Sequence, residues 1–122
     1  MVGNLTFGNG FFHEYIGNFN QRNMKIAWTT TETLAQAKNL AKQCIDSKLA
    51  VCAQISSPIT SIYQWNGEME ETIEFRITLK FLKSRQSELK KLVLEIHPYE
   101  TPQWAVADLS EVSEGYRTWA EG

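Results

Sequence analysis

Two side chains in this sequence are suited to bind a soft or borderline metal ion: His97 and Cys52. Imidazole is the commonest transition-metal ligand in proteins, and a thiolate binds Cu(I) well. One histidine and one cysteine do not complete a site, so each residue keeps a structural alternative. His97 follows a predicted helix, where it can bond a carbonyl group and interact favourably with the helix dipole. Cys52 begins a predicted strand, where a small buried thiol packs as an apolar residue.

Further side chains are candidates for holding a small organic molecule. Tyr63, Trp65 and Tyr99 offer flat faces that could stack on a planar ligand, with Glu100 beside Tyr99. Lys80, next to such a cleft, could hold an anion. The alternatives are packing between subunits for the aromatic residues and a solvated strand end for the lysine.

Four glutamates on one predicted strand raise the question of acid–base catalysis or a hard-metal site: Glu68, Glu70, Glu71 and Glu74. Strand alternation places all of them except Glu71 on one face, and carboxylates on an exposed sheet face are usually only solvated. The sequence contains no Ser-His-Asp order, phosphate loop, HExxH motif or nucleophile elbow. We therefore predict a binding protein and not an enzyme.

Length, charge and composition exclude several classes of protein. The chain has 122 residues, enough for one domain with its own core, and a net charge of −2 without a basic patch, which argues against a nucleic-acid partner. It contains no apolar run of the ~20 residues that a membrane helix needs, and no signal-peptide pattern. Two cysteines are too few for a disulfide framework. These features predict a cytoplasmic protein without a membrane partner.

The elements that must position these residues follow from hydrophobic spacing. A buried strand over 25–30 precedes a helix that Thr31 is expected to cap and that ends near Lys48. Ser84 is expected to cap a second helix, which Pro98 ends. A strand over 102–109 and a short helix over 111–120 complete the chain.

A long β-hairpin is expected between the two helices, over 52–65 and 69–81, with Asn66-Gly67 as its turn. Apolar residues take odd positions in both strands, and residues opposite each other share a face. A three-residue loop with a G1 bulge, which sets Gln64 opposite Glu68, would keep odd against odd. Pro58 cannot donate a ladder hydrogen bond, so a second bulge or kink is expected there.

The length of this hairpin predicts assembly. Fourteen residues span roughly 46 Å, whereas a compact chain of this size has a diameter of about 35 Å. Apolar side chains on the overhang, including Tyr63, Trp65 and Met69, need cover. A neighbouring subunit is the simplest cover.

The element order is β-α-β-β-α-β followed by a short helix, which is the pattern of an α+β, ferredoxin-like fold: an antiparallel sheet with two helices on one face. Residues 1–23 hold four glycines and five asparagines without periodicity. We predict an N-terminal extension over 1–23 and one folded domain over 24–122.

Two motifs resemble those of the CutA family of divalent-cation tolerance proteins. The run TSIYQWNGEMEE (60–71) resembles the family's hairpin motif, and HPYETP (97–102) resembles its signature after the second helix. The resemblance extends to four single positions in the chain: Cys52, Lys80, Tyr116 and Trp119.

The resemblance implies a PII-like homotrimer, in which long hairpins cross between subunits and clefts form between them. It also implies a role in the response to metal ions, copper above all, with no required cofactor. Some bacterial members have a cysteine and a glutamate linked to copper where this chain has Trp28 and Gln103, so only His97 of that set is kept.

Two alternative functions stay open. A small hydrolase resembling acylphosphatase would share the ferredoxin-like fold, but it would need an arginine in a phosphate-cradling loop, which the sequence lacks. A trimeric scaffold without any ligand is the other alternative.

Overall fold

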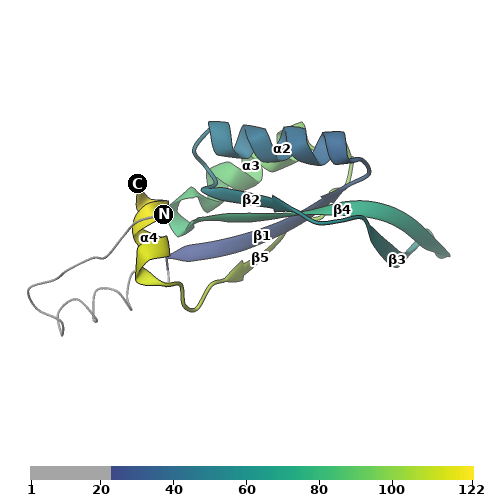
Figure 1. The fold of residues 1–122 in the computed structure, drawn as a ribbon. Coiled ribbons are helices and arrows are strands. Elements are labelled where there is room, and N and C mark those ends of the chain that lie inside the picture. The colour runs from purple at the N-terminus through teal and green to yellow at the C-terminus, as the bar shows by residue number, and fades with distance from the viewer. Residues whose placement is uncertain (1–22) are drawn as a thin grey trace, which may run out of the picture.

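The chain folds as an antiparallel sheet that carries two helices on one face (Figure 1). This computed structural model describes residues 23–122, so the extension predicted over 1–23 lies outside the described residues except for Asn23. The predicted β-α-β-β-α-β order with a short final helix is confirmed, because β2 and β3 together form one arm of the hairpin. The elements are β1 (Met24–Thr31), α2 (Leu34–Asp46), β2 (Cys52–Ile55), β3 (Ile59–Trp65), β4 (Glu68–Leu82), a 3₁₀ turn (Lys83–Arg85), α3 (Gln86–Ile96), β5 (Ala105–Asp108) and α4 (Glu114–Glu121).

Strand β4 lies inside the sheet and pairs with strands on both of its sides. It pairs with β1 on one side and with β2 and then β3 on the other, and β5 pairs with the far edge of β1. Odd-numbered residues of β1 and β4 lie opposite each other, as in Ala27 with Leu79, and face α2 and α3. The core lies between this sheet face and the two helices, and it includes Ala27, Ala37, Leu40, Ala41, Cys44, Ala50, Ile77, Leu79, Phe81, Leu89 and Val93.

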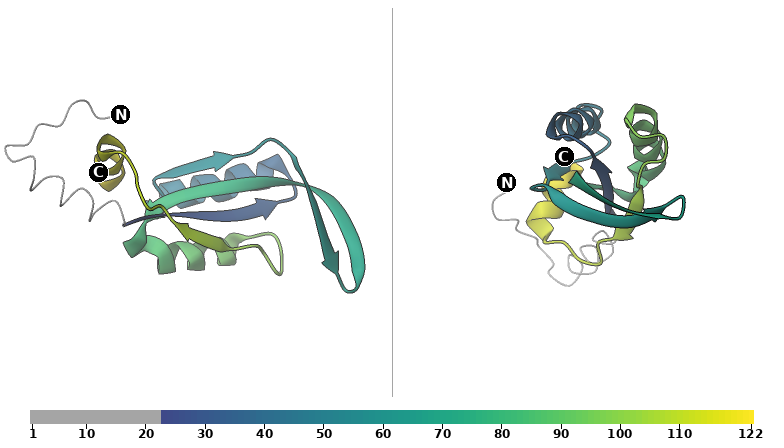
Figure 2. Two further views of the ribbon diagram at one scale, coloured as in Figure 1. Left: turned by 90° about the horizontal axis from the view of Figure 1, so that it is seen from below. Right: turned by 90° about the vertical axis from the view of Figure 1, so that its right-hand side faces the viewer.

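The other face of the sheet is not covered by α2 or α3 (Figure 2). It presents the even-numbered residues of β1, β2 and β4, among them Ile26, Trp28 and Lys80, which are half-buried. Helix α4 lies at one end of the molecule, where the ring of Tyr116 is 5.7 Å from the Lys80 ammonium nitrogen. This open face continues onto the hairpin at the other end.

The hairpin contains one bulge, at the position where Pro58 predicts it. Ile55 pairs with Ile77, whereas Ile59 pairs with Glu74, so the three residues 56–58 lie against the two residues 75–76. The Ser56 N–H donates to the Arg76 carbonyl and the Ser56 hydroxyl accepts from the Arg76 N–H, both at 2.9 Å. The ladder is therefore held at the bulge by Ser56 alone.

The turn at the tip differs from the prediction. Trp65 pairs with Glu68, so the loop has two residues, Asn66 and Gly67, with φ values of 52° and 79°. Positive φ at both positions defines a type I′ turn, which matches the twist of the strands. The predicted three-residue loop with Gln64 opposite Glu68 is wrong, because the extra residue is accommodated upstream, at the bulge.

The first helix begins two residues later than predicted. Thr31 remains in β1, and Thr33 caps α2 by accepting the Gln36 N–H at 3.1 Å, while the Gln36 side chain accepts the Thr33 N–H at 3.1 Å. This capping box satisfies two orphan N–H groups at once, which a cap at Thr31 could not do.

The second helix also starts differently. Ser84 lies in the 3₁₀ turn and caps nothing, since the turn continues directly into α3 at Gln86. The helix ends at Ile96, as Pro98 predicts. Strand β5 covers only part of the predicted range 102–109, and residues 102–104 are left outside the sheet.

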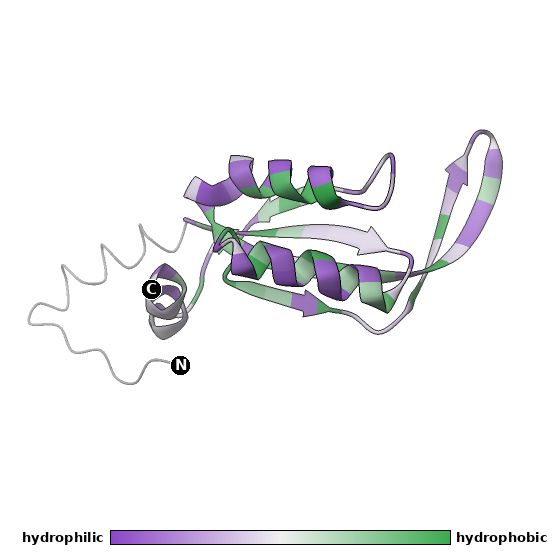
Figure 3. Cartoon of the chain, turned by 90° about the horizontal axis from the view of Figure 1, so that it is seen from above, coloured by the Kyte–Doolittle hydropathy of each residue, from purple (hydrophilic) through white to green (hydrophobic). Residues whose placement is uncertain are grey.

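The predicted overhang of the hairpin is confirmed, since β3 and the start of β4 project beyond the helices and curve away (Figures 1 and 2). Hydrophobic residues, coloured green in Figure 3, occur along this projection. Met69 is 73% exposed and Ile73 56% exposed, with Ile62 on the same face of the hairpin.

Replacing Gly67 with alanine is expected to destabilise the protein by about 1 kcal/mol, because the left-handed backbone at φ 79° disfavours a side chain. No heavy atom lies within 4 Å of the added methyl group, so the cost is conformational and not steric. Chemical denaturation measures it. Asn66→Gly is the matched control and should change stability little; a Gly67→Ala protein as stable as the wild type would contradict the turn.

Candidate functional site

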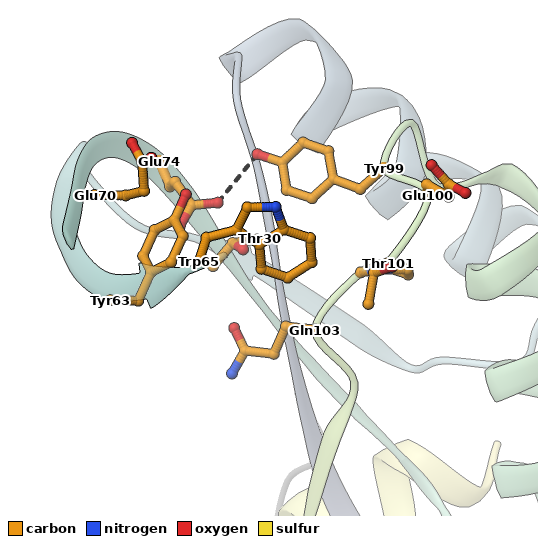
Figure 4. A pocket seen from close by; sticks show the side chains of 10 residues that line it. Thr30, Tyr63, Trp65, Glu70, Glu74, Tyr99, Glu100, Thr101 and Gln103 are labelled. Atoms are coloured by element: carbon orange, nitrogen blue, oxygen red, sulfur yellow. Dashed lines mark hydrogen bonds between the residues drawn. The ribbon is translucent and has the colours of Figure 1, made fainter. Parts of the chain in front are cut away.

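A pocket of about 610 Å³ lies between the curved hairpin and the segment that links α3 to β5 (Figure 4). It is open to solvent on the side of the sheet opposite the helices. Its lining comes from the end of β1, from both hairpin strands and from the linking segment, and comprises Thr30, Tyr63, Trp65, Glu70, Glu74, Tyr99, Glu100, Thr101, Pro102 and Gln103.

Strand pairing places the hairpin residues of the pocket on one face. Tyr63 lies directly opposite Glu70, Trp65 is two residues further along β3, and Glu74 is four residues further along β4. Because side chains alternate along a strand, all four point to the same side. Trp65 is 55% exposed, and in Figure 4 its indole lies between Tyr99 and Gln103.

Tyr99 joins the linking segment to the hairpin. Its hydroxyl donates a hydrogen bond of 3.0 Å to a Glu74 carboxylate oxygen (Figure 4). Burial and this carboxylate raise the pKa of Tyr99, so the phenol remains a donor at any physiological pH. The bond closes one wall of the pocket.

His97 lies beneath this wall and is buried. Its Nδ1 accepts the Tyr99 N–H at 3.1 Å, so the proton of the neutral ring is on Nε2, which donates to the Thr29 hydroxyl at 2.9 Å. The imidazole and Tyr99 rings are 4.9 Å apart. His97 therefore positions Tyr99, and both of its nitrogens are engaged within the protein.

The other predicted site residues lie elsewhere. Cys52 is opposite Lys80, at the far end of the open sheet face from the pocket. Lys80 is six residues along β4 from Glu74, which is about 20 Å. The structure thus brings together Tyr63, Trp65, Tyr99 and Glu100, with His97 beneath them, and places Cys52 and Lys80 apart from them.

Glu70 and Glu74 line the pocket, although their charge predicted only solvated positions. Both are half-buried. Their place in the pocket could have been predicted from the pairing of Tyr63 with Glu70, but only with the correct strand register. Thr30 and Gln103 also line the pocket, and no feature of the sequence pointed to Thr30.

The two predicted metal ligands, His97 and Cys52, do not come together in this chain. Within residues 23–122 no three His, Cys, Asp or Glu side chains come close enough to hold a metal ion. His97 has no free ring nitrogen, and Cys52 is on the face of the sheet opposite the one His97 contacts. Trp28 and Gln103 add no metal ligand of the usual kinds.

An antiparallel sheet with helices on one face, and a projecting hairpin that encloses a pocket, define a small α+β protein. Residues 25–122 match the family described as CutA1 divalent ion tolerance protein. The Divalent-cation tolerance protein CutA of Yersinia pestis is 31% identical over 97 residues, which are 80% of this chain and 82% of the relative. The chain belongs to the CutA1 family.

A second relative, named Protein CutA homolog, from Xenopus laevis, is 31% identical over 96 residues. These are 79% of this chain and 64% of the relative, so the chain spans under two thirds of that protein. The name of the Yersinia relative describes tolerance, and neither name states an enzymatic activity.

Solved structures agree with the fold. CutA1 of Ehrlichia chaffeensis superposes with a TM-score of 0.78 at 30% identity, covering 82% of this chain and 94% of its own. CutA1 of Oryza sativa superposes with a TM-score of 0.78 at 26% identity, covering 80% of this chain and 90% of its own. The CutA of Archaeoglobus fulgidus, described as periplasmic, gives 0.77 at 26% identity, covering 80% and 95%.

No helix among residues 23–122 is long and apolar enough to span a membrane.

The stability of the protein is expected to fall as the pH is lowered below about 6.5, in part through His97. Burial lowers the pKa of His97 in the folded state, against the opposing effects of a hydrogen bond to the Thr30 backbone and of the Glu74 charge, so the unfolded chain takes up the proton first. Denaturation at about pH 7.5 and about pH 5.5 measures the loss. His97→Asn keeps an acceptor but does not titrate, and should lose less stability between the two values; an equal loss in both proteins would contradict this role.

Proposed function

We propose that this chain is a trimeric module that binds a small molecule in the pocket between the hairpin and residues 99–103, and so contributes to divalent-cation tolerance. The pocket itself supports the proposal most directly: it has the volume of a small-molecule site and contains three aromatic side chains with three carboxylates. The cation-tolerance role rests on the names of the relatives in the CutA1 family.

Binding without catalysis is favoured by the chemistry of the pocket. The histidine–hydroxyl pair of His97 and Thr29 is buried and does not line it, so no substrate reaches this pair. No arginine among residues 23–122 lines it either, and its carboxylates would repel an acyl phosphate. These observations count against the acylphosphatase-like alternative.

Assembly as a trimer is supported by the uncovered face of the hairpin. Ile62, Met69 and Ile73 lie on one face of a two-stranded projection, which is marginally stable without further packing. The ferredoxin-like arrangement, supported by the strand order, would carry three such hairpins in a PII-like trimer. Free thiols at Cys44 and Cys52 suit a reducing compartment, so we place the protein in the cytoplasm.

Charging the hairpin face is expected to dissociate the trimer. Ile73→Lys puts an ammonium group in the proposed interface, where its desolvation is costly. Light scattering after size exclusion should give three times the chain mass for the wild type and one chain mass for the variant. Leu94→Lys, at an exposed apolar residue of α3, is the matched control and should remain trimeric. A monomeric wild type would refute the assembly.

Loss of the Trp65 indole is expected to abolish ligand binding. A thermal-shift screen of metabolites and metal ions, Cu(II) included, should find organic compounds that stabilise the wild type by about 2.7 kcal/mol at 100 times their Kd. Trp65→Ala should lose this shift, and Trp119→Ala, at an exposed indole on α4, should keep it. A screen in which no organic compound depends on Trp65 would favour the ligand-free scaffold instead.

A further inference from the structure

The charged side chains that line the pocket are all acidic. Glu70 and Glu74 project from the hairpin, and Glu100 lies on the opposite side (Figure 4). A second hollow of about 550 Å³ shares Tyr63, Glu74 and Tyr99 with the pocket and adds Glu32. No lysine, arginine or histidine of the described part of the chain lines either hollow.

No salt bridge within residues 23–122 neutralises these carboxylates. The salt bridges among residues 23–122 join other pairs, such as Lys25 with Asp108, and none involves the four glutamates of the two hollows. Glu74 accepts a hydrogen bond from the Tyr99 hydroxyl, which is neutral. The negative charge of the site is therefore available to a ligand.

The aromatic side chains of the pocket also attract cations. Tyr63, Trp65 and Tyr99 surround the pocket, and an indole face is the best aromatic partner for a cation. Aromatic faces together with carboxylates favour a cation that carries an apolar part.

We infer that the pocket binds a small organic ammonium ion, its charged group against Glu70 and Glu74 and its apolar part against Trp65. The inference rests on the proposed function, because it names the chemical class of the ligand for that same pocket. An inorganic divalent cation suits the site less, since no three metal-binding side chains converge within residues 23–122. Aromatic rings also supply no oxygen ligands for such an ion. An anion would be repelled.

The test compares three probes that share one ring and differ in charge: benzylamine, benzyl alcohol and benzoate. Calorimetry with the full chain at low ionic strength should show benzylamine binding at least about tenfold more tightly than benzyl alcohol, and benzoate not at all. Added salt should weaken the binding of benzylamine and leave the affinity for benzyl alcohol unchanged.

Substitutions separate the charge from the shape of the pocket. Glu70→Gln and Glu74→Gln should each weaken benzylamine about tenfold and leave benzyl alcohol unaffected, since glutamine keeps the size and an acceptor for Tyr99. Trp65→Ala should weaken both probes. Glu88→Gln, on the exposed surface of α3, is the matched control and should change neither.

Three outcomes would overturn the ammonium assignment but keep the pocket as a binding site. They are equal affinity for all probes, tightest binding of benzoate, or a screening hit that depends on Trp65 when benzylamine does not bind. Benzoate binding would mean that a basic side chain of another copy completes the pocket. If neither the probes nor any screened organic compound binds in a Trp65-dependent way, the proposed function itself fails.

Discussion

The bulge at residues 56–58 is the constraint on which the rest of the hairpin depends. Without it, the register of β2 would continue, and Tyr63 would lie opposite Met69, on the face away from Glu70. One extra residue switches the pairing, so the aromatic row of β3 meets the carboxylate row of β4. A backbone irregularity of a single residue thus brings together the hairpin side of the pocket. Pro58 has no N–H to donate, so the bulge sacrifices no ladder hydrogen bond at that residue.

The sequence predicted the parts of the hairpin but not how they combine. The turn signal at Asn66-Gly67 and the disturbance at Pro58 each follow from local chemistry, and both are observed. The register depends on the number of bulges between Ile55 and Glu68, and a parity rule cannot choose between one bulge and two. The rule also assumed that apolar residues must meet apolar residues, which holds for a covered sheet but not for a projection that lines a pocket.

The sequence indicates which candidate residues are neighbours where they are close along the chain, but not where their proximity depends on strand register. Tyr99 and Glu100 follow a helix end that Pro98 fixes, so their neighbourhood is local. Cys52 and Lys80 carry equally suggestive chemistry, but their distance from the pocket follows from how far along β4 each strand pairs. The hydrogen bond of His97 to Thr29 joins the segment after α3 to β1 across 68 residues of sequence, and no spacing in the sequence reveals it.

In the proposed trimer, the pocket and the assembly depend on the same hairpin. Tyr63, Glu70 and Glu74 lie on one of its faces, and Ile62, Met69 and Ile73 on the other. A two-stranded projection is flexible unless something packs against it, so covering the apolar face would also fix the pocket walls. By linkage, a ligand that binds only the ordered hairpin must strengthen subunit association by the same free energy with which association strengthens ligand binding. The two faces of one hairpin, set by one bulge, therefore supply a physical route by which occupancy of the pocket is communicated between subunits.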